Sequence, residues 1–375
     1  MMSINRRQWI QQSLLASATV LLAGAPVAQG CASERPRELG DKDDLILLNW
    51  NENPYGPSET AIKAVNDAMK YANRYPDEVA NELKEKLAKK NNLRTKNFLL
   101  TAGSTEVLSL LGQHVALQKG EILTPFPTFP TALRFGERTG ATVRKVDLDA
   151  DDRIDLAKVL AAISDKTTMV FICNPNNPTG TEVATEDLRN FCRQVPENVL
   201  ICVDEAYVEY SNAGLKGSMI GLVDELPNLV ICRTFSKAYG LAGLRMGYAV
   251  SHKRNIDALS QRHLGAEIST GWPPLVAASA SMDDPEFINS CVAKNTEGKR
   301  ILYEAYDAWG VKYHASSTNF VYARDDRFEG NLVAKMKERG FLITKWPSMT
   351  DHIRVSIGKP EHMRLYVDSV KELLV

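Results

Sequence analysis

The sequence has no long block of one charge, no paired cysteine motif and no internal repeat. Its 45 Lys plus Arg and 46 Asp plus Glu leave a formal charge of -1, so a nucleic-acid binder that neutralises phosphates is not indicated. The cysteines show no CxxC spacing and the six histidines no metal-ligand spacing, so neither a redox motif nor a metal site is predicted. The absence of a repeat of about 20 to 50 residues argues against a solenoid.

What is present is the composition of an ordinary globular protein. The chain has 375 residues, of which 44% are hydrophobic and 24% charged. At roughly 150 residues per domain, this length predicts two or three domains. We predict four segments along the chain: a signal peptide (1–31), an N-terminal arm (45–75), a large domain (76–272) and a small C-terminal domain (273–375).

Residues 1–31 have the architecture of an export signal. They contain no acidic residue, and the paired Arg6 and Arg7 precede an apolar run from Leu14 to Ala28. That run is shorter than the roughly 20 residues needed to span a bilayer. The stretch INRRQWIQ resembles a twin-arginine signal, which predicts that the protein is exported folded, by the twin-arginine machinery, to the periplasm. An uncleaved anchor and a lipid on Cys31 stay open as alternatives.

Short apolar strands alternate with amphipathic helices over residues 98–250, which predicts an α/β fold with a mostly parallel sheet covered by helices on both faces. Continuous apolar runs such as MVFIC are typical of strands buried on both sides. After residue 273 the pattern changes. A long charged helix over 285–309 is followed by the strands NFVYAR, GFLITKW and HIRVSIG and by a last helix, which predicts a smaller α+β domain.

Three successive predicted strands end in polar side chains. Asn177 follows the first, Asp204 and Tyr207 follow the second, and Lys237 follows the third. In parallel-sheet proteins, ligands bind beyond the carboxyl ends of the strands. We therefore expect these four side chains to meet in one crevice.

The stretch around Lys237 combines a nucleophile with groups that bind phosphate. A lysine at the end of a buried strand is partly desolvated, which lowers its pKa and suits it to imine formation. The hydroxyls of Thr234 and Ser236 and the guanidinium of Arg245 suit a phosphate group. A carboxylate, a phenol, an amide and an amine in one crevice meet the needs of pyridoxal phosphate.

Several motifs in this order resemble those of one enzyme family. LNWNENPYGPS (48–58), TAGSTE (101–106), NPNNPTG (174–180) and TFSKAYGLAGLR (234–245) are similar to motifs of the class I/II, or fold type I, pyridoxal-phosphate aminotransferases. Within them the chain is similar to the histidinol-phosphate aminotransferase-like group, over roughly residues 45–375. The resemblance implies a homodimer, pyridoxal 5'-phosphate as cofactor, and an amino donor and a 2-oxo acid acceptor as substrates.

The resemblance also implies roles for individual residues. Lys237, Asp204 and Tyr207 would be catalytic, and Arg354, Asn53 and Asn177 would bind substrate, with Arg354 on the α-carboxylate. The residues that would contact the cofactor are Tyr75, Gly103, Ser104, Thr105, Phe129, Asn177, Asp204, Tyr207, Thr234, Ser236, Lys237 and Arg245. Of these, Tyr75 would reach across the dimer interface.

The sequence departs from the histidinol-phosphate group where that group binds the substrate phosphate. Thr344 stands where an arginine is usual, and Lys345 should face the other way because side chains alternate along a strand. We therefore predict an aminotransferase for unphosphorylated amino acids with a neutral or aromatic-tolerant pocket, lined by Trp346 and Trp50. A decarboxylase or β-lyase on the same fold and a non-catalytic periplasmic binding protein stay open as alternatives.

Overall fold

The computed structural model describes residues 45–264, 269–346 and 351–375. The predicted export signal, including Cys31, lies outside the described residues. Within the described ranges, no helix is long and apolar enough to cross a membrane.

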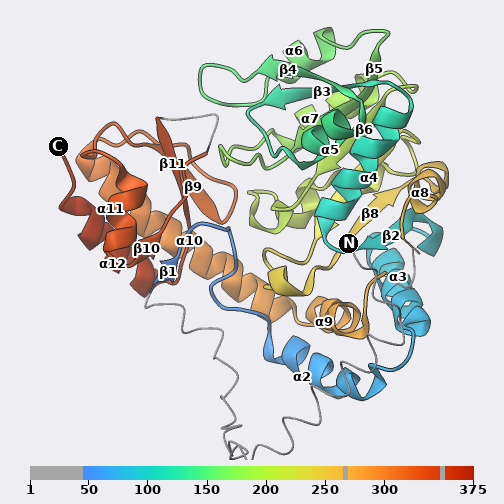
Figure 1. Cartoon of the computed structure of the whole chain (residues 1–375), viewed down its shortest axis with the longest axis horizontal. Coiled ribbons are helices and arrows are strands. Elements are labelled where there is room, and N and C mark those ends of the chain that lie inside the picture. The colour runs from blue at the N-terminus through green and yellow to red at the C-terminus, as the bar shows by residue number, and fades with distance from the viewer. Residues whose placement is uncertain (1–44, 265–268, 347–350) are drawn as a thin grey trace, which may run out of the picture. The chain divides into compact units, whose positions relative to one another are not determined.

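A seven-stranded sheet forms the centre of the larger part of the protein (Figure 1). Its strand order is β2-β8-β7-β6-β5-β3-β4, and every pairing is parallel except those of β8 with β2 and β7. The predicted α/β fold with a mostly parallel sheet is confirmed. The strands are β2 (Phe98–Thr101), β3 (Glu121–Phe126), β4 (Thr142–Asp147), β5 (Thr167–Cys173), β6 (Leu200–Asp204), β7 (Leu229–Thr234) and β8 (Gly247–Ser251).

The two faces of this sheet bury separate hydrophobic cores. Along β6, Ile201 and Val203 point into one core while Cys202 points into the other, as the two-residue period of a strand requires. Burial on both faces explains why these strands read as continuous apolar runs. All five cysteines of the described residues are free and buried, and a buried free thiol packs as a small apolar side chain.

Helices cover both faces of the sheet. The helices that contribute buried side chains to the first core are α2 (Glu59–Ala68), α3 (Asp77–Asn91), α6 (Leu156–Ala161), α7 (Thr185–Gln194) and α9 (Trp272–Met282). Those that pack into the second core are α4 (Ser104–Leu117), α5 (Thr131–Thr139) and α8 (Lys253–Ser260). Short 3-10 turns connect several elements, among them η3 (Val208–Tyr210) after β6 and η6 (Ala242–Leu244) after β7.

The C-terminal part has a third core of its own. Helix α10 (Pro285–Trp309) runs into it, and the other elements that surround it are β9 (Phe320–Arg324), α11 (Leu332–Glu338), β10 (Phe341–Leu342), β11 (His352–Ser356) and α12 (Pro360–Lys371). Strands β9 and β11 are antiparallel, and β10 pairs in parallel with β1 (Ile46–Leu47), so the N-terminal arm joins this part (Figure 1).

The predicted strand GFLITKW is shorter than expected. Only two of its residues pair with β1, and Thr344 then forms an isolated antiparallel bridge to Arg354. The segment is divided because its first half pairs with β1 and its second half with β11.

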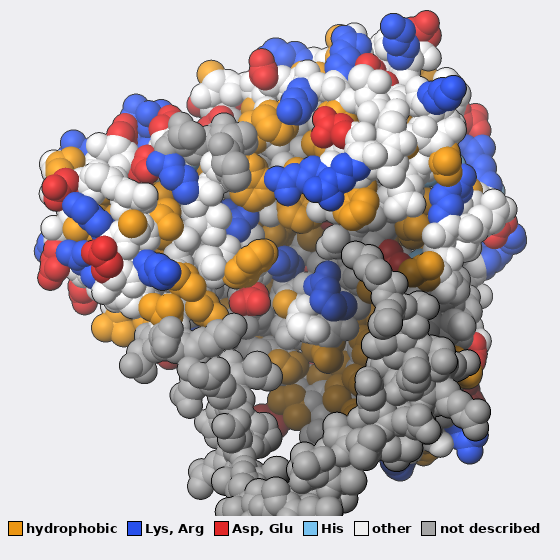
Figure 2. All heavy atoms as spheres, in the orientation of Figure 1, with side chains coloured by type: hydrophobic (Ala, Val, Ile, Leu, Met, Phe, Trp, Pro, Cys, Tyr) orange, Lys and Arg blue, Asp and Glu red, His pale blue; other side chains and the backbone are white. Residues whose placement is uncertain are grey.

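On the face shown in Figure 2, acidic and basic side chains are interspersed among apolar ones.

Candidate active site

A cavity of about 360 Å³ lies beyond the carboxyl ends of β5, β6 and β7. Parallel strands that end together place their following loops around one crevice. Eleven of the predicted site residues line this cavity: Ser104, Thr105, Phe129, Asn177, Asp204, Tyr207, Thr234, Ser236, Lys237, Arg245 and Arg354. Trp50 and Trp346, which were predicted to line the substrate pocket, are also part of its wall.

Among the described residues that line this cavity, Lys237 is the only lysine. Its Nζ donates to the backbone oxygen of Trp50 at 3.2 Å and lies 5.8 Å from the centre of the Tyr207 ring. Burial, followed by the positive charges of Arg354 and Arg245, lowers its pKa to about 8. A neutral amine is the form that attacks a carbonyl carbon or removes a proton.

Asp204 ends β6 and is 1% exposed. Its carboxylate accepts one backbone hydrogen bond, from the N–H of Ala206 at 3.2 Å, and among the described residues no cation forms an ion pair with it. Burial, with the charge of Glu205 adding to it, raises its pKa to about 7. A buried carboxylate with spare acceptor capacity is suited to a cationic N–H group of a ligand.

Tyr207 places its hydroxyl between two asparagine amides. The Nδ2 groups of Asn51 and Asn177 lie 3.0 and 3.3 Å from the Tyr207 oxygen. Asn51 lines the cavity but was not predicted from the sequence. Its positive φ of 55° and its hydrogen bond from Ser356 Oγ to its Oδ1 at 2.9 Å both depend on tertiary structure, which sequence spacing alone does not show.

Arg354 brings a buried positive charge to the wall of the cavity. Its Nη1 donates to Asn177 Oδ1 at 2.8 Å and its Nη2 to the backbone oxygen of Asn49 at 2.8 Å. Among the described residues, the buried Nε has no hydrogen-bond partner and no carboxylate pairs with the guanidinium. The guanidinium lies over the aromatic rings of Phe320 and Trp346, whose centroids are 5.3 and 5.4 Å from Cζ. An arginine in this state is suited to a ligand carboxylate.

Another part of the cavity wall is suited to a phosphate. Ser104 and Thr105 begin α4, a 14-residue helix whose free N–H groups and dipole favour an anion. Arg245 donates from Nη1 to Ser236 Oγ at 3.3 Å and from Nη2 to Thr105 Oγ1 at 3.5 Å. No ion pair of Arg245 with a carboxylate is present in the described part of the chain. The hydroxyl of Thr234 donates a hydrogen bond to Ser236 Oγ at 3.0 Å.

Glycine is required where the helix start and Arg245 approach each other. Gly103 has a φ of 78°, and a Cβ on it would lie 2.5 Å from Arg245 Nη2. A Cβ on Gly247 would lie 2.5 Å from the backbone nitrogen of Ser104. Gly103 itself does not line the cavity but allows Arg245 to reach it.

Besides Gly103, two predicted residues do not line this cavity. Tyr75 is 79% exposed and is absent from its lining. Asn53 is buried, and its Nδ2 donates to the backbone oxygen of Ala238 at 2.9 Å and to Cys291 Sγ at 3.3 Å. Asn53 therefore supports the loop that follows Lys237 rather than facing the cavity, and Asn51, two residues earlier, has the position next to Tyr207.

These observations fit pyridoxal phosphate. The buried carboxylate of Asp204, the amine of Lys237, and the Arg245 guanidinium with the N-terminus of α4 lie around one cavity. They match the ring nitrogen, the aldehyde and the phosphate of that cofactor, respectively. The fold and the site together define a pyridoxal-phosphate-dependent enzyme of fold type I.

Comparison with known proteins identifies the family. The family model for aminotransferase class I and II matches residues 43–370, so the chain belongs to the class I and II aminotransferases. It is 38% identical to a histidinol-phosphate aminotransferase of Symbiobacterium thermophilum, over 90% of this chain and 92% of the relative. A second such enzyme, from Bacillus licheniformis, is 34% identical over 93% and 97%.

A solved structure supports both the fold and the cofactor. Histidinol-phosphate aminotransferase from Sinorhizobium meliloti in complex with pyridoxal-5'-phosphate aligns with a TM-score of 0.79 and 26% identity, over 87% of this chain and 90% of that one. The protein is thus an aminotransferase that depends on pyridoxal phosphate, and it has histidinol-phosphate aminotransferases as homologues.

Proposed function

We propose that this enzyme transfers the amino group of an unphosphorylated α-amino acid to a 2-oxo acid. The observation that carries the proposal is the state of Arg354. Its guanidinium is buried and lines the cavity, and its Nε has no hydrogen-bond partner among the described residues, so a substrate α-carboxylate would supply an acceptor. A bidentate contact with the guanidinium would also orient Cα toward Lys237.

The other site residues have roles that follow from their contacts. Lys237 is the base placed to carry the α-proton, Asp204 would hold the ring nitrogen of the cofactor protonated, and Tyr207 and Asn177 would bind the ring hydroxyl oxygen. Ser236, Arg245 and the α4 N-terminus would hold the phosphate, with Phe129 against the ring. When bound, pyridoxal phosphate supplies an electron-accepting ring that stabilises negative charge at Cα.

The preference for unphosphorylated donors is supported by the segment after β10. The hydroxyl of Thr344 donates a hydrogen bond to the backbone oxygen of Asn49 at 3.0 Å. Lys345 points elsewhere, as the alternation of side chains predicts, because its Nζ lies 2.6 Å from Asp325 Oδ2. Neither residue offers the cavity a cation. The exposed ring of Trp50 and the ring of Trp346 offer apolar surface instead, which suits neutral or aromatic side chains.

The assembly and location of the enzyme are further parts of this proposal. We infer a homodimer in which the exposed Tyr75 reaches the phosphate bound by the partner. The sequence of residues 1–31 supports export in the folded state by the twin-arginine machinery. A cofactor that is made in the cytoplasm is most simply loaded before such export.

We expect cofactor capture by Lys237 to depend on pH with a midpoint near 8. Only the neutral amine attacks the aldehyde, so the rate constant should rise as pH increases through the lowered pKa and level off above it. For a lysine with an ordinary pKa, the midpoint would be about 10.4. Stopped-flow absorbance of cofactor-free protein mixed with pyridoxal phosphate measures this rate. Arg354→Gln removes one of the charges that lower the pKa, so its midpoint should be higher. A wild-type midpoint above 10 would contradict the desolvation of Lys237.

The donor preference is tested by the bound cofactor's absorbance. Adding single amino acids without an oxo acid should convert the lysine-bound form to the amino form with neutral or aromatic donors, and not with histidinol phosphate or phosphoserine. Product analysis separates the alternatives: an oxo acid released without ammonia indicates transamination, carbon dioxide a decarboxylase, ammonia a lyase, and no change with any donor a binding protein.

A designed variant sharpens this test. Thr344→Arg should raise kcat/KM for a phosphorylated donor about tenfold or more, because a charge-assisted hydrogen bond contributes about 1.5–3 kcal/mol. Lys345→Gln is the matched control, since Lys345 faces Asp325, and it should leave the donor ranking unchanged. A wild-type enzyme that already prefers the phosphorylated donor would overturn the proposed specificity.

A further inference from the structure

Three side chains that are far apart in the sequence meet outside the cavity. Asp152, His314 and His352 each offer one metal-ligating atom, and these atoms all lie within 4.8 Å of one another. The nearest pair is His314 Nε2 and Asp152 Oδ2 at 2.8 Å. Asp152 and His314 are partly exposed and His352 is buried, so an ion held here would keep access to solvent. None of the three takes part in the proposed reaction.

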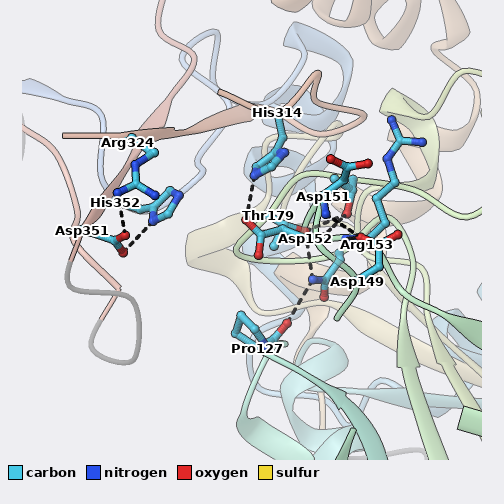
Figure 3. A network of polar contacts seen from close by, with 12 residues as sticks. Pro127, Asp149, Asp151, Asp152, Arg153, Thr179, His314, Arg324, Asp351 and His352 are labelled. Atoms are coloured by element: carbon cyan, nitrogen blue, oxygen red, sulfur yellow. Dashed lines mark hydrogen bonds and ion pairs between the residues drawn. The ribbon is translucent and has the colours of Figure 1, made fainter. Parts of the chain in front are cut away.

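The carboxylate of this cluster belongs to a hydrogen-bonded turn (Figure 3). Asp149 Oδ1 accepts hydrogen bonds from the backbone nitrogens of Asp151 and Arg153 at 2.9 and 2.8 Å. Asp152 lies between them with a φ of 53°, and its backbone oxygen accepts from Thr181 Oγ1 at 3.2 Å. The turn therefore fixes the backbone at Asp152, from which the carboxylate reaches His314.

His352 has the second-sphere contact that is typical of a metal-binding histidine. Its Nδ1 lies 2.8 Å from Asp351 Oδ1 (Figure 3), which leaves Nε2 as the ligating atom. A carboxylate on one ring nitrogen fixes the tautomer and raises the basicity of the other. The ring also stacks on Tyr322, with centroids 4.5 Å apart and planes at 3°. The nearby Arg324 forms ion pairs with Asp326 and Asp351, each at 3.2 Å.

We propose that Asp152, His314 and His352 bind a divalent ion of the zinc class. Two imidazoles and one carboxylate with an open position form a donor set that zinc prefers. Bonds of about 2.0–2.2 Å in a tetrahedral site place ligand atoms about 3.4 Å apart. The present separations would change by about 1.5 Å or less to reach that geometry, which side-chain rotation can supply.

The ion would connect the two parts of the protein. Asp152 lies between β4 and α6 of the larger part, whereas His314 precedes β9 and His352 begins β11. His352 and Arg354 share one face of β11 because they are two residues apart. Bound zinc would therefore tie the strand that carries Arg354 to the turn at Asp152. This inference concerns residues outside the cavity and does not depend on the donor preference proposed above.

Titration of the cofactor-loaded protein, first freed of metal by a chelator, tests the site. Isothermal titration with zinc chloride should show one ion per chain, and cobalt chloride should give visible d–d absorption. His314→Gln and His352→Gln should abolish both signals. Asp351→Asn should weaken zinc binding by about 10- to 100-fold, the usual effect of losing a second-sphere carboxylate.

Matched variants separate this site from incidental binding. Asp326→Asn removes a contact with Arg324 but none with a histidine, and His362→Gln removes a histidine of α12, so both should bind zinc within twofold of the wild type. Retained cofactor absorbance shows that each variant is folded. Absence of zinc binding, or equal stoichiometry in the His314→Gln, His352→Gln double variant and the wild type, would overturn the proposal.

Discussion

Replacing Lys237 with alanine is expected to lower the rate of amino transfer by at least about 10⁴-fold, the upper range for loss of a positioned general base. The expectation rests on the cavity lining, because Lys237 is the only lysine that the described part of the chain contributes to it. The variant should still bind pyridoxal phosphate through its phosphate contacts, but the absorbance of the lysine-bound form should be absent. Steady-state kinetics with the best donor and a spectrum of the purified variant measure the two effects.

A second buried lysine provides the matched control. Lys299 resembles Lys237 in that burial lowers its pKa to about 8, but its Nζ donates to the backbone oxygen of Ser316 at 2.6 Å, outside the cavity. Lys299→Met should retain kcat in the folded fraction, although it leaves that oxygen without its donor and so reduces stability. If Lys237→Ala kept turnover and Lys299→Met lost it, the base would have been assigned to the wrong residue.

The strand-end residues were predictable because their positions follow from local pattern. Apolar runs identify buried strands, and the polar side chain after each run must lie at one edge of a parallel sheet. Asn177, Asp204 and Lys237 meet around the cavity for this reason. The orientation of Lys345 was predictable on the same basis, since the period of two places it opposite Thr344.

Features that depend on several distant segments were not predictable. Asn51 faces Tyr207 while Asn53 does not, because hydrogen bonds to Ser356 and Ala238 fix how the arm turns. Motif matching alone gave no means to choose between the two asparagines. The cluster of Asp152, His314 and His352 has no sequence signature at all, since its members come together only when the two parts of the chain pack.

Replacing Asp204 with asparagine should lower kcat by about 10²- to 10⁴-fold. The substitution preserves shape but removes the charge opposite the cofactor's ring nitrogen, and loss of one partner of a buried ion pair costs about 3–5 kcal/mol. The affinity for pyridoxal phosphate should fall as well. Kinetics at saturating cofactor, together with equilibrium dialysis of the cofactor, separate the effect on turnover from the effect on binding.

Glu205→Gln is the matched control for Asp204→Asn, because the two carboxylates are neighbours. Glu205 is as buried as Asp204, but its carboxylate is bonded to Arg233 at 3.2 Å, to Ser218 at 2.6 Å and to the backbone nitrogen of Met219 at 2.7 Å. Glu205→Gln should therefore reduce the free energy of unfolding, since it weakens a satisfied network, and leave kcat of the folded enzyme nearly unchanged.

Asp204→Asn should have the opposite effect on the stability of the cofactor-free protein. Burial raises the folded-state pKa of Asp204 from 3.8 to about 7, so the ionised form destabilises the fold, and this penalty grows as pH rises from about 4 to 7. Its full size is up to about 4 kcal/mol, at 1.36 kcal/mol for each pKa unit. Asparagine carries no such penalty, so the cofactor-free variant should unfold at higher denaturant than the wild type at pH 8 and at similar denaturant at pH 4. A cofactor-free variant that is less stable at pH 8 would show that Asp204 has a cationic partner within the protein, and its charge would then not be reserved for the cofactor.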